Sequence, residues 1–219
     1  MKHVRWLLFC LSVILVTNVW GERHPKQELL FTGQALHNGK PIAMYFGVSS
    51  RLGSGVFVGT NKRGDSSVSP SVSGRIVIPD SVKIPHDLKL GHRVIFPAGT
   101  VLPVVCISRR AFADCSRLTE IVLPNTLLYI NDQAFRGCKS LKSITLPPRL
   151  KRIYSAAFRD CSRLNRITSM GATPPDTYND VFTAETLRQA TLVLPHGTYG
   201  AYHKVMPWSL FCYFFENLP

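Results

Sequence analysis

A phrase of 23 residues recurs in the middle of this 219-residue chain and limits the folds that the chain can adopt. Copies begin at Ala111, Ala134 and Ala157, and the regular part of the pattern covers residues 111–169. The repeated columns are Phe112/Phe135/Phe158, Cys115/Cys138/Cys161, Leu118/Leu141/Leu164, Ile121/Ile144/Ile167, Leu123/Leu146, Pro124/Pro147, Leu127/Leu150 and Ile130/Ile153. Self-similarity at a period in the twenties predicts a solenoid, in which each repeat packs against its neighbours.

The spacing of apolar residues within one 23-residue repeat predicts one coil of such a solenoid. The spacing Leu118-x-x-Ile121-x-Leu123 points three apolar side chains toward the same side. The alternation in its second half predicts a short strand with one face on the core. Pro124 lacks an N–H and should end the strand, after which Leu127 and Ile130 return inward. We expect Ala111 to Cys115 to form a short helical or 3₁₀ corner. Because one coil cannot bury its own apolar edge, successive strands should stack roughly 4.8 Å apart in a parallel sheet.

The phrase continues less regularly on both sides of the three repeats. Ile76 to Pro79 and Val94 to Pro97 resume the strand-then-proline pattern, and Lys83 to His92 is the expected insertion between them. After the third repeat, Thr173 to Pro175 should break the coil, but Phe182 and Leu192 fall where one more coil with a small insertion would place them. The sequence therefore predicts a solenoid over residues 74–195, with atypical terminal coils.

The segments before and after the repeats do not follow the 23-residue pattern. Residues 1–21 resemble a cleaved secretory signal: Lys2 and Arg5 precede an apolar run that is too short to span a bilayer, and Gly21 offers a cleavage point. A membrane anchor and lipidation of Cys10 are the alternatives. Residues 22–73 should form a hairpin-rich β cap over Leu29 to Val58, with a turn at Asn38-Gly39, and then a flexible surface loop from Gly59.

Residues 196–219 contain a group of aromatic side chains: Tyr199, Tyr202, Trp208, Phe211, Tyr213, Phe214 and Phe215. The simplest interpretation is a C-terminal cap that covers the open end of the core. The alternative is an exposed aromatic patch that binds a carbohydrate or another partner.

The pattern AFxxCxxLxxIxLPxxLxxI, as it stands in Ala134 to Ile153, resembles the BspA-like leucine-rich repeats of bacterial surface antigens. Looser similarity covers 74–79 and 102–107 as entry segments and 173–175, 192–195, Tyr202, Trp208 and Phe211 as a closing segment. The resemblance implies an α/β or mainly β leucine-rich repeat solenoid with a parallel sheet. It also implies a secreted or surface-attached binding module without catalysis, and it names no ligand.

The sequence contains little that indicates catalysis or a cofactor. It has no HExxH, GxSxG, Walker-type or dinucleotide-binding motif, and no CxxC spacing typical of a zinc site. Cys115, Cys138 and Cys161 share one column and should be buried free thiols, because parallel side chains in register meet with poor disulfide dihedrals. Asp114 and Asp160 also share a column, where a turn role is expected. We predict no enzyme, cofactor or metal.

Two surfaces are candidates for binding. The first is the outward face of the repeat strands, formed by Glu120, Val122, Ser143, Thr145, Arg166, Thr168, Thr191 and Val193. The second is a basic stripe, formed by Arg117, Arg136, Lys139, Lys142, Arg159 and Arg163. Twelve Lys and Arg against four Asp and Glu lie between residues 109 and 166, and a basic stripe attracts polyanions. An ordinary solvated surface remains the alternative for both.

The expected function is recognition of an extracellular protein or glycan in adhesion or surface assembly. One alternative is a polyanion-binding module that uses the basic stripe, and another is a structural subunit of a surface complex. The expected location is secreted or on the cell surface, with the periplasm also possible. Without residues 1–21 the chain has 24 basic and 13 acidic side chains and no further membrane-spanning run. Secretion argues against nucleic acid as the partner.

Overall fold

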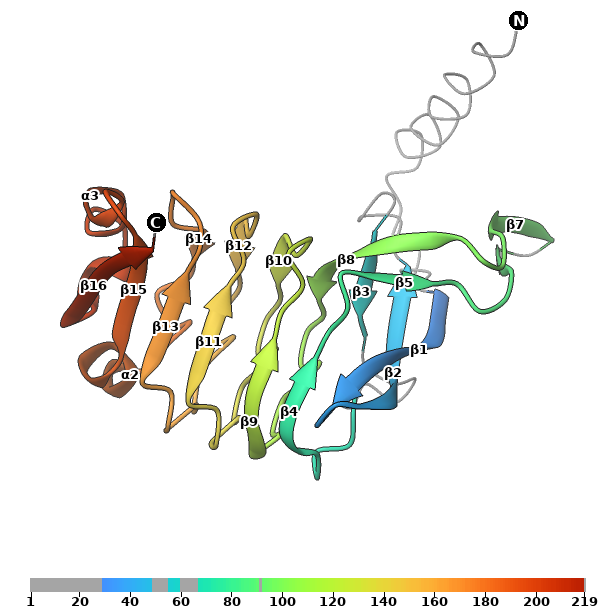
Figure 1. Ribbon diagram of the computed structural model, residues 1–219, viewed down its shortest axis with the longest axis horizontal. Coiled ribbons are helices and arrows are strands. Elements are labelled where there is room, and N and C mark those ends of the chain that lie inside the picture. Colours follow the sequence, from blue (N-terminus) through green and yellow to red (C-terminus); the bar gives the residue numbers. More distant parts are fainter. Residues whose placement is uncertain (1–28, 49–54, 60–66, 91, 219) are drawn as a thin grey trace, which may run out of the picture.

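The computed structural model describes residues 29–48, 55–59, 67–90 and 92–218. The molecule is elongated, and its strands lie side by side along the long axis from the N-terminal hairpin to the C-terminal strand (Figure 1). The expected signal peptide and the first half of the expected surface loop lie outside the described residues.

One long face of the molecule is a row of parallel strands (Figure 1). Its members are β4 (Ser73–Val77), β9 (Arg117–Val122), β11 (Ser143–Leu146), β13 (Arg166–Ser169), β15 (Thr191–Pro195) and β16 (Tyr213–Leu218). β4 pairs in parallel with β9, and β11 begins a separate sheet, although the Ser140 N–H just before β11 donates to the Ser116 carbonyl just before β9. Within the sheet of β11, β13, β15 and β16, Ile144 lies opposite Ile167 and Ile167 lies opposite Leu192. Each of these apolar residues is at most 2% exposed, so the predicted inward columns are confirmed.

A second parallel ladder lies on the opposite side of the repeats (Figure 1). It contains β8 (Val101–Ile107), β10 (Tyr129–Ile130), β12 (Arg152–Ile153) and β14 (Asp176–Thr177). We did not expect this ladder, because strands of two residues are too short to show alternation. The expectation that Thr173 to Pro175 break the coil was wrong, because Asp176 directly after them pairs with Arg152.

The corner of each repeat is a turn rather than the helical segment that we expected. Arg110 and Asp114 have left-handed φ angles of 57° and 61°, and this pair recurs at Gln133 with Gly137 and at Ala156 with Asp160. Between the two left-handed residues the Phe side chain enters the core. Phe112 stacks on Phe135 at 5.3 Å and Phe135 on Phe158 at 5.2 Å, so one aromatic column runs through the repeats.

The N-terminal hairpin is formed as predicted. Strands β1 (Leu29–His37) and β2 (Lys40–Val48) are antiparallel and joined by Asn38-Gly39, both with positive φ, as a tight hairpin turn requires. Strand β3 (Val56–Val58) connects this hairpin to β8, and β1 also pairs with β4. The hairpin therefore joins both ladders. The expected surface loop is not exposed throughout, because Ser67 and Val68 are buried and Ser73 begins β4.

The hairpin formed by residues 88–90 and 93–96 projects from the repeats (Figure 1). Strand β5 (Ser81–Lys83) pairs with the start of β8, while β6 (Leu88–Leu90) and β7 (Arg93–Phe96) pair only with each other. The expectation that Val94 to Pro97 form a coil was therefore wrong. Val94 and Ile95 are 39% and 38% exposed, because β7 joins neither ladder.

The C-terminal part completes the core with one more repeat and three short elements. Phe182 stacks on Phe158 at 5.7 Å, and the small insertion that we expected is helix α2 (Ala184–Gln189). Helix α3 (Tyr199–Tyr202) and the 3₁₀ turn η2 (Trp208–Leu210) follow β15. Trp208 is fully buried, contacts the Phe182 ring edge-on at 5.8 Å, and donates a 3.2 Å hydrogen bond to the Pro175 carbonyl. One hydrophobic core runs from Phe31 to Phe211.

Candidate binding face

The outward side chains of the parallel strands form two rows, which we call the open face. In the first row, strand register aligns Arg75 with Glu120 and, in the next sheet, Ser143 with Arg166, Thr191 and Tyr213. In the second row it aligns Val77 with Val122, and Thr145 with Thr168, Val193 and Phe215. The 23-residue period places Ser143 and Thr145 at the repeat positions of Glu120 and Val122. Side chains alternate across a strand, so these rows point away from the core that Ile121 and Ile144 enter. The open face is thus polar along most of its length and aromatic at its C-terminal end.

The structure brings all eight residues predicted for this face together. Seven are exposed or half-buried, but Val193 is only 2% exposed and does not contribute a solvated side chain. It lies between Thr168 and Phe215 in the second row, and the sequence did not predict that β16 would flank it. Tyr213 and Phe215, which we expected in the C-terminal aromatic group and not on this face, also belong to it and are 58% and 49% exposed. The alternation Tyr213-x-Phe215 was the signal for an additional strand.

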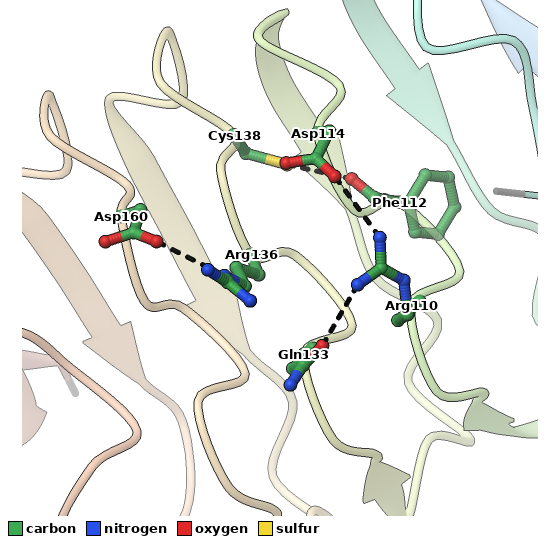
Figure 2. Close-up of polar contacts among 7 residues, drawn as sticks. All are labelled: Arg110, Phe112, Asp114, Gln133, Arg136, Cys138 and Asp160. Carbon is green, nitrogen blue, oxygen red and sulfur yellow. Dashed lines mark hydrogen bonds and ion pairs between the residues drawn. The ribbon is translucent and has the colours of Figure 1, made fainter. Parts of the chain in front are cut away.

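The predicted basic stripe is not one uninterrupted row of unpaired cations. Arg136 lies at the repeat corner and donates from Nε to Asp160 Oδ2 at 3.2 Å (Figure 2). At the corner of the preceding repeat, Arg110 donates to Gln133 at 3.2 Å and to Asp114 at 3.4 Å (Figure 2). Arg159 is exposed on the next corner, whereas Arg117, Lys139, Lys142 and Arg163 lie where the strands of the open face begin. The corner cations thus link repeats, each exposed pair contributing at most about 1 kcal/mol.

Two adjoining hollows mark the edge where the strands of the open face begin. One, of about 470 Å³, is lined by Lys142, Ser162, Arg163, Asn165 and Gln189. The other, of about 740 Å³, is lined by Glu185, Arg188, Gln189, Thr191 and Tyr213. Gln189 lines both, and its side-chain amide donates a 3.3 Å hydrogen bond to the Ser162 carbonyl. We call these two hollows together the basic edge.

The cysteine column has a packing role. Cys115, Cys138 and Cys161 are fully buried and are not disulfide-bonded. The Cys138 thiol donates to the Phe112 carbonyl, and the Cys161 thiol donates to the Phe135 carbonyl, both at 3.2 Å (Figure 2 shows the first). Burial raises the pKa of Cys161 to about 12 and that of Cys138 well above its ordinary value. Neutral, buried thiols are poor nucleophiles and poor metal ligands, so this column offers no reactive site.

Polar side chains at the C-terminal end of the core are likewise bonded internally. The Tyr202 hydroxyl contacts Ser169 at 2.7 Å and donates to the Gly171 carbonyl at 2.9 Å, and burial raises the Tyr202 pKa. Within the described ranges, no group of three or more His, Cys, Asp or Glu could hold a metal ion. Among the helices of those ranges, none has the length and apolar character to cross a membrane.

Comparison with known proteins agrees with the repeat geometry. Residues 104–196 match the family model described as BspA type leucine rich repeat region, in six copies. The match contains the three regular repeats and extends beyond them in both directions, to the strands β8 and β15. No curated protein and no solved structure matches the chain significantly. Residues 104–196 of this chain are therefore a BspA type leucine-rich repeat region.

Proposed function

We propose that this chain is a non-catalytic recognition module that acts outside the cell, in adhesion or surface assembly, and binds a protein or glycan through the open face. In this proposal the repeats form a solenoid, with the hairpin of β1 and β2 as its N-terminal cap and the aromatic segment around Trp208 as its C-terminal cap. The observation that carries the proposal is the register of the open face, whose outward side chains align in two rows across successive repeats.

Such a face suits recognition for a physical reason. Its side chains project from strands that are held in parallel sheets, so a partner orders little chain when it binds. The rows include neutral hydroxyls at Thr145 and Thr168, a charge at Arg166 and an aromatic ring at Tyr213. Stacked repeats commonly bind partners through a surface of this kind.

The test is binding of residues 22–219 to a panel of extracellular matrix proteins and glycans at low and high salt. The variant Thr145→Arg with Thr168→Arg places two long cations in the middle of the open face, and we expect it to lose binding to any protein that binds the natural chain. Asn179→Arg, at an exposed position after β14, is the matched control and should bind normally. Equal binding by both variants would contradict the proposal.

A structural subunit of a surface complex is the second candidate, favoured by the exposed Tyr213 and Phe215 at the end of the open face. A stable one-to-one complex that survives high salt would support it, because apolar contacts resist screening. The proposed location outside the cell rests on the signal-like residues 1–21. Amino-terminal sequencing of the exported protein should find a start at Glu22, and retention of residues 1–21 would contradict cleavage.

A further inference from the structure

We propose that the basic edge binds an anionic oligosaccharide, with acidic groups on Lys142, Arg163 and Arg188 and one sugar ring against Tyr213. The inference rests on the proposed function, since the basic edge shares Thr191 and Tyr213 with the open face, and it names one ligand class and its place. Four observations support it: the cations without ion pairs to described residues, the shape of the edge, its neutral lining groups and the position of Tyr213.

The cations of the basic edge are exposed and form no ion pair within the described ranges, unlike the four arginines that link neighbouring strands and turns. Four ion pairs neutralise Arg75, Arg110, Arg136 and Arg152 through carboxylates 2.9–3.4 Å away. In the described part of the chain, no carboxylate lies within 4.0 Å of the charged groups of Lys142, Arg163 or Arg188. Arg188 uses only its Nε, in a 3.3 Å hydrogen bond to the Ala184 carbonyl. The edge thus collects three exposed cations that form no ion pair with a described carboxylate, against one lining carboxylate at Glu185, and this excess of positive charge attracts anions.

The two hollows of the basic edge form one extended site. Lys142 immediately precedes β11 and Tyr213 begins β16, so the lining runs across the starts of four neighbouring strands. Three strand spacings amount to roughly 14 Å. Gln189 forms part of both hollows, so the two hollows adjoin and a ligand longer than one of them can contact both. This shape fits a short linear chain better than a single small anion.

The neutral lining groups favour a saccharide over an acidic peptide. Ser162, Asn165, Gln189 and Thr191 alternate with the cations and offer hydroxyl and amide groups to the hydroxyls of a sugar. Glu185 also lines the site, and its carboxylate would repel a dense run of peptide carboxylates but accepts hydrogen bonds from hydroxyls. An anionic sugar chain has both kinds of group, because its acidic substituents are separated by hydroxyl-bearing rings.

Tyr213 supplies an aromatic surface at one end of this lining. Its side chain is 58% exposed, although its strand is held by pairing with β15, which places Tyr213 opposite Thr191. A sugar ring has a face of C–H groups that packs on an aromatic ring, while its edge hydroxyls reach neighbouring polar side chains. Tyr213, Thr191 and Gln189 line the same hollow, so the geometry allows both contacts to one ring.

Calorimetric titration of residues 22–219 tests the inference. The probes are a hyaluronan hexasaccharide, a chondroitin sulfate hexasaccharide, neutral cellohexaose and hexaglutamate. We expect binding of one or both anionic saccharides, which separates carboxylate from sulfate recognition. Lys142→Gln with Arg163→Gln should weaken that binding about tenfold per lost charge-assisted hydrogen bond. Tyr213→Ala should weaken it about threefold, as expected for loss of one ring contact.

Matched controls separate the site from general charge and aromaticity. Arg149→Gln with Lys151→Gln removes the same charge at exposed positions before β12, and Tyr178→Ala removes a ring that is 52% exposed next to β14. Both should bind as the natural chain does. Equal weakening in variants and controls, binding of hexaglutamate as tight as that of the saccharides, or no saccharide binding would overturn the inference. The variant Thr145→Arg with Thr168→Arg should still bind saccharide, so protein recognition by the open face can fail or succeed separately.

Discussion

At the scale of single residues, some side chains of the repeat both fill the core and form hydrogen bonds to backbone carbonyls. Cys138 and Cys161 are the clearest cases: each thiol fills a small buried space and donates to the carbonyl of the Phe in the preceding repeat. A larger side chain would overpack this layer, and a carboxylate would be buried without compensation. The column therefore ties neighbouring repeats together without any covalent bond.

The raised pKa of Cys161 predicts a loss of stability in alkaline solution. The thiol ionises near its ordinary value of 9.0 in the unfolded chain but only near about 12 in the folded chain. Its contribution is therefore complete below pH 9 and falls as pH rises toward 12, by about 1.4 kcal/mol per pH unit at most. Urea unfolding of residues 22–219 at a series of pH values should show a smaller alkaline loss in Cys161→Ala.

Cys212→Ala is the control, because it removes an exposed thiol, and it should keep the alkaline loss of the natural chain. Identical pH dependence in the natural chain and in Cys161→Ala would show that ionisation of this thiol is not linked to unfolding.

At the scale of one repeat, two left-handed residues make the corner that turns the chain from one ladder toward the other. The second of these positions is occupied by Asp114, Gly137 and Asp160. Left-handed φ is costly for residues with a side chain, although Asp and Asn tolerate it better than most. We expected Asp114 and Asp160 to form turns, and both do so through their left-handed backbone conformation. The Asp160 side chain also accepts the hydrogen bond from Arg136.

Gly137→Ala should destabilise the protein by about 1–2 kcal/mol, because alanine at a φ of +74° is strained. The added Cβ would also lie 2.6 Å from Asp114 Oδ1, an exposed side-chain atom that can move. Gly197→Ala is the matched control, since Gly197 has a φ of +76° and nothing within 4 Å of the added carbon. Chemical denaturation should give losses of similar size, with Gly137→Ala slightly larger. An unchanged stability of both variants would refute the strain argument.

At the scale of the whole molecule, one hydrophobic core connects the N-terminal hairpin to the C-terminal aromatic residues. Stacked repeats can unfold piecewise when the interfaces between them are weak. Here the Phe column, the two ladders and the buried Trp208 continue the packing from repeat to repeat. We therefore expect the whole core to unfold in one cooperative transition.

Trp208 makes this expectation measurable, because residues 22–219 contain no other tryptophan. Phe46→Ala removes a fully buried ring at the opposite end of the core and should cost about 3–5 kcal/mol. Cooperative unfolding predicts that the Trp208 fluorescence transition and the circular dichroism transition both shift to lower denaturant by the same amount. Tyr45→Ala, at a neighbouring position that is 41% exposed, should shift neither. A Trp208 transition that stays in place would mean that the two ends unfold independently.

The sequence by itself determined the features that depend on spacing along the chain. The 23-residue period placed Phe135 over Phe112 and Ile167 beside Ile144, because every copy repeats the same inward positions. The same reasoning located the last repeat through Phe182 and the hairpin turn at Asn38-Gly39. These features are local or periodic, so the pattern was sufficient to predict them.

Only the tertiary structure decided which partners meet across repeats. Arg136 finds Asp160 24 residues away, and β16 covers Val193 while it exposes Tyr213. Val94 follows the pattern of a repeat strand, yet it pairs only with Lys89 of β6 in a projecting hairpin, and neither strand of that hairpin joins a ladder of the repeats. The unpaired cations of the basic edge likewise emerge only when the carboxylates of adjacent repeats are placed. Such outcomes depend on the neighbours that stacking supplies, and spacing along the chain does not encode them.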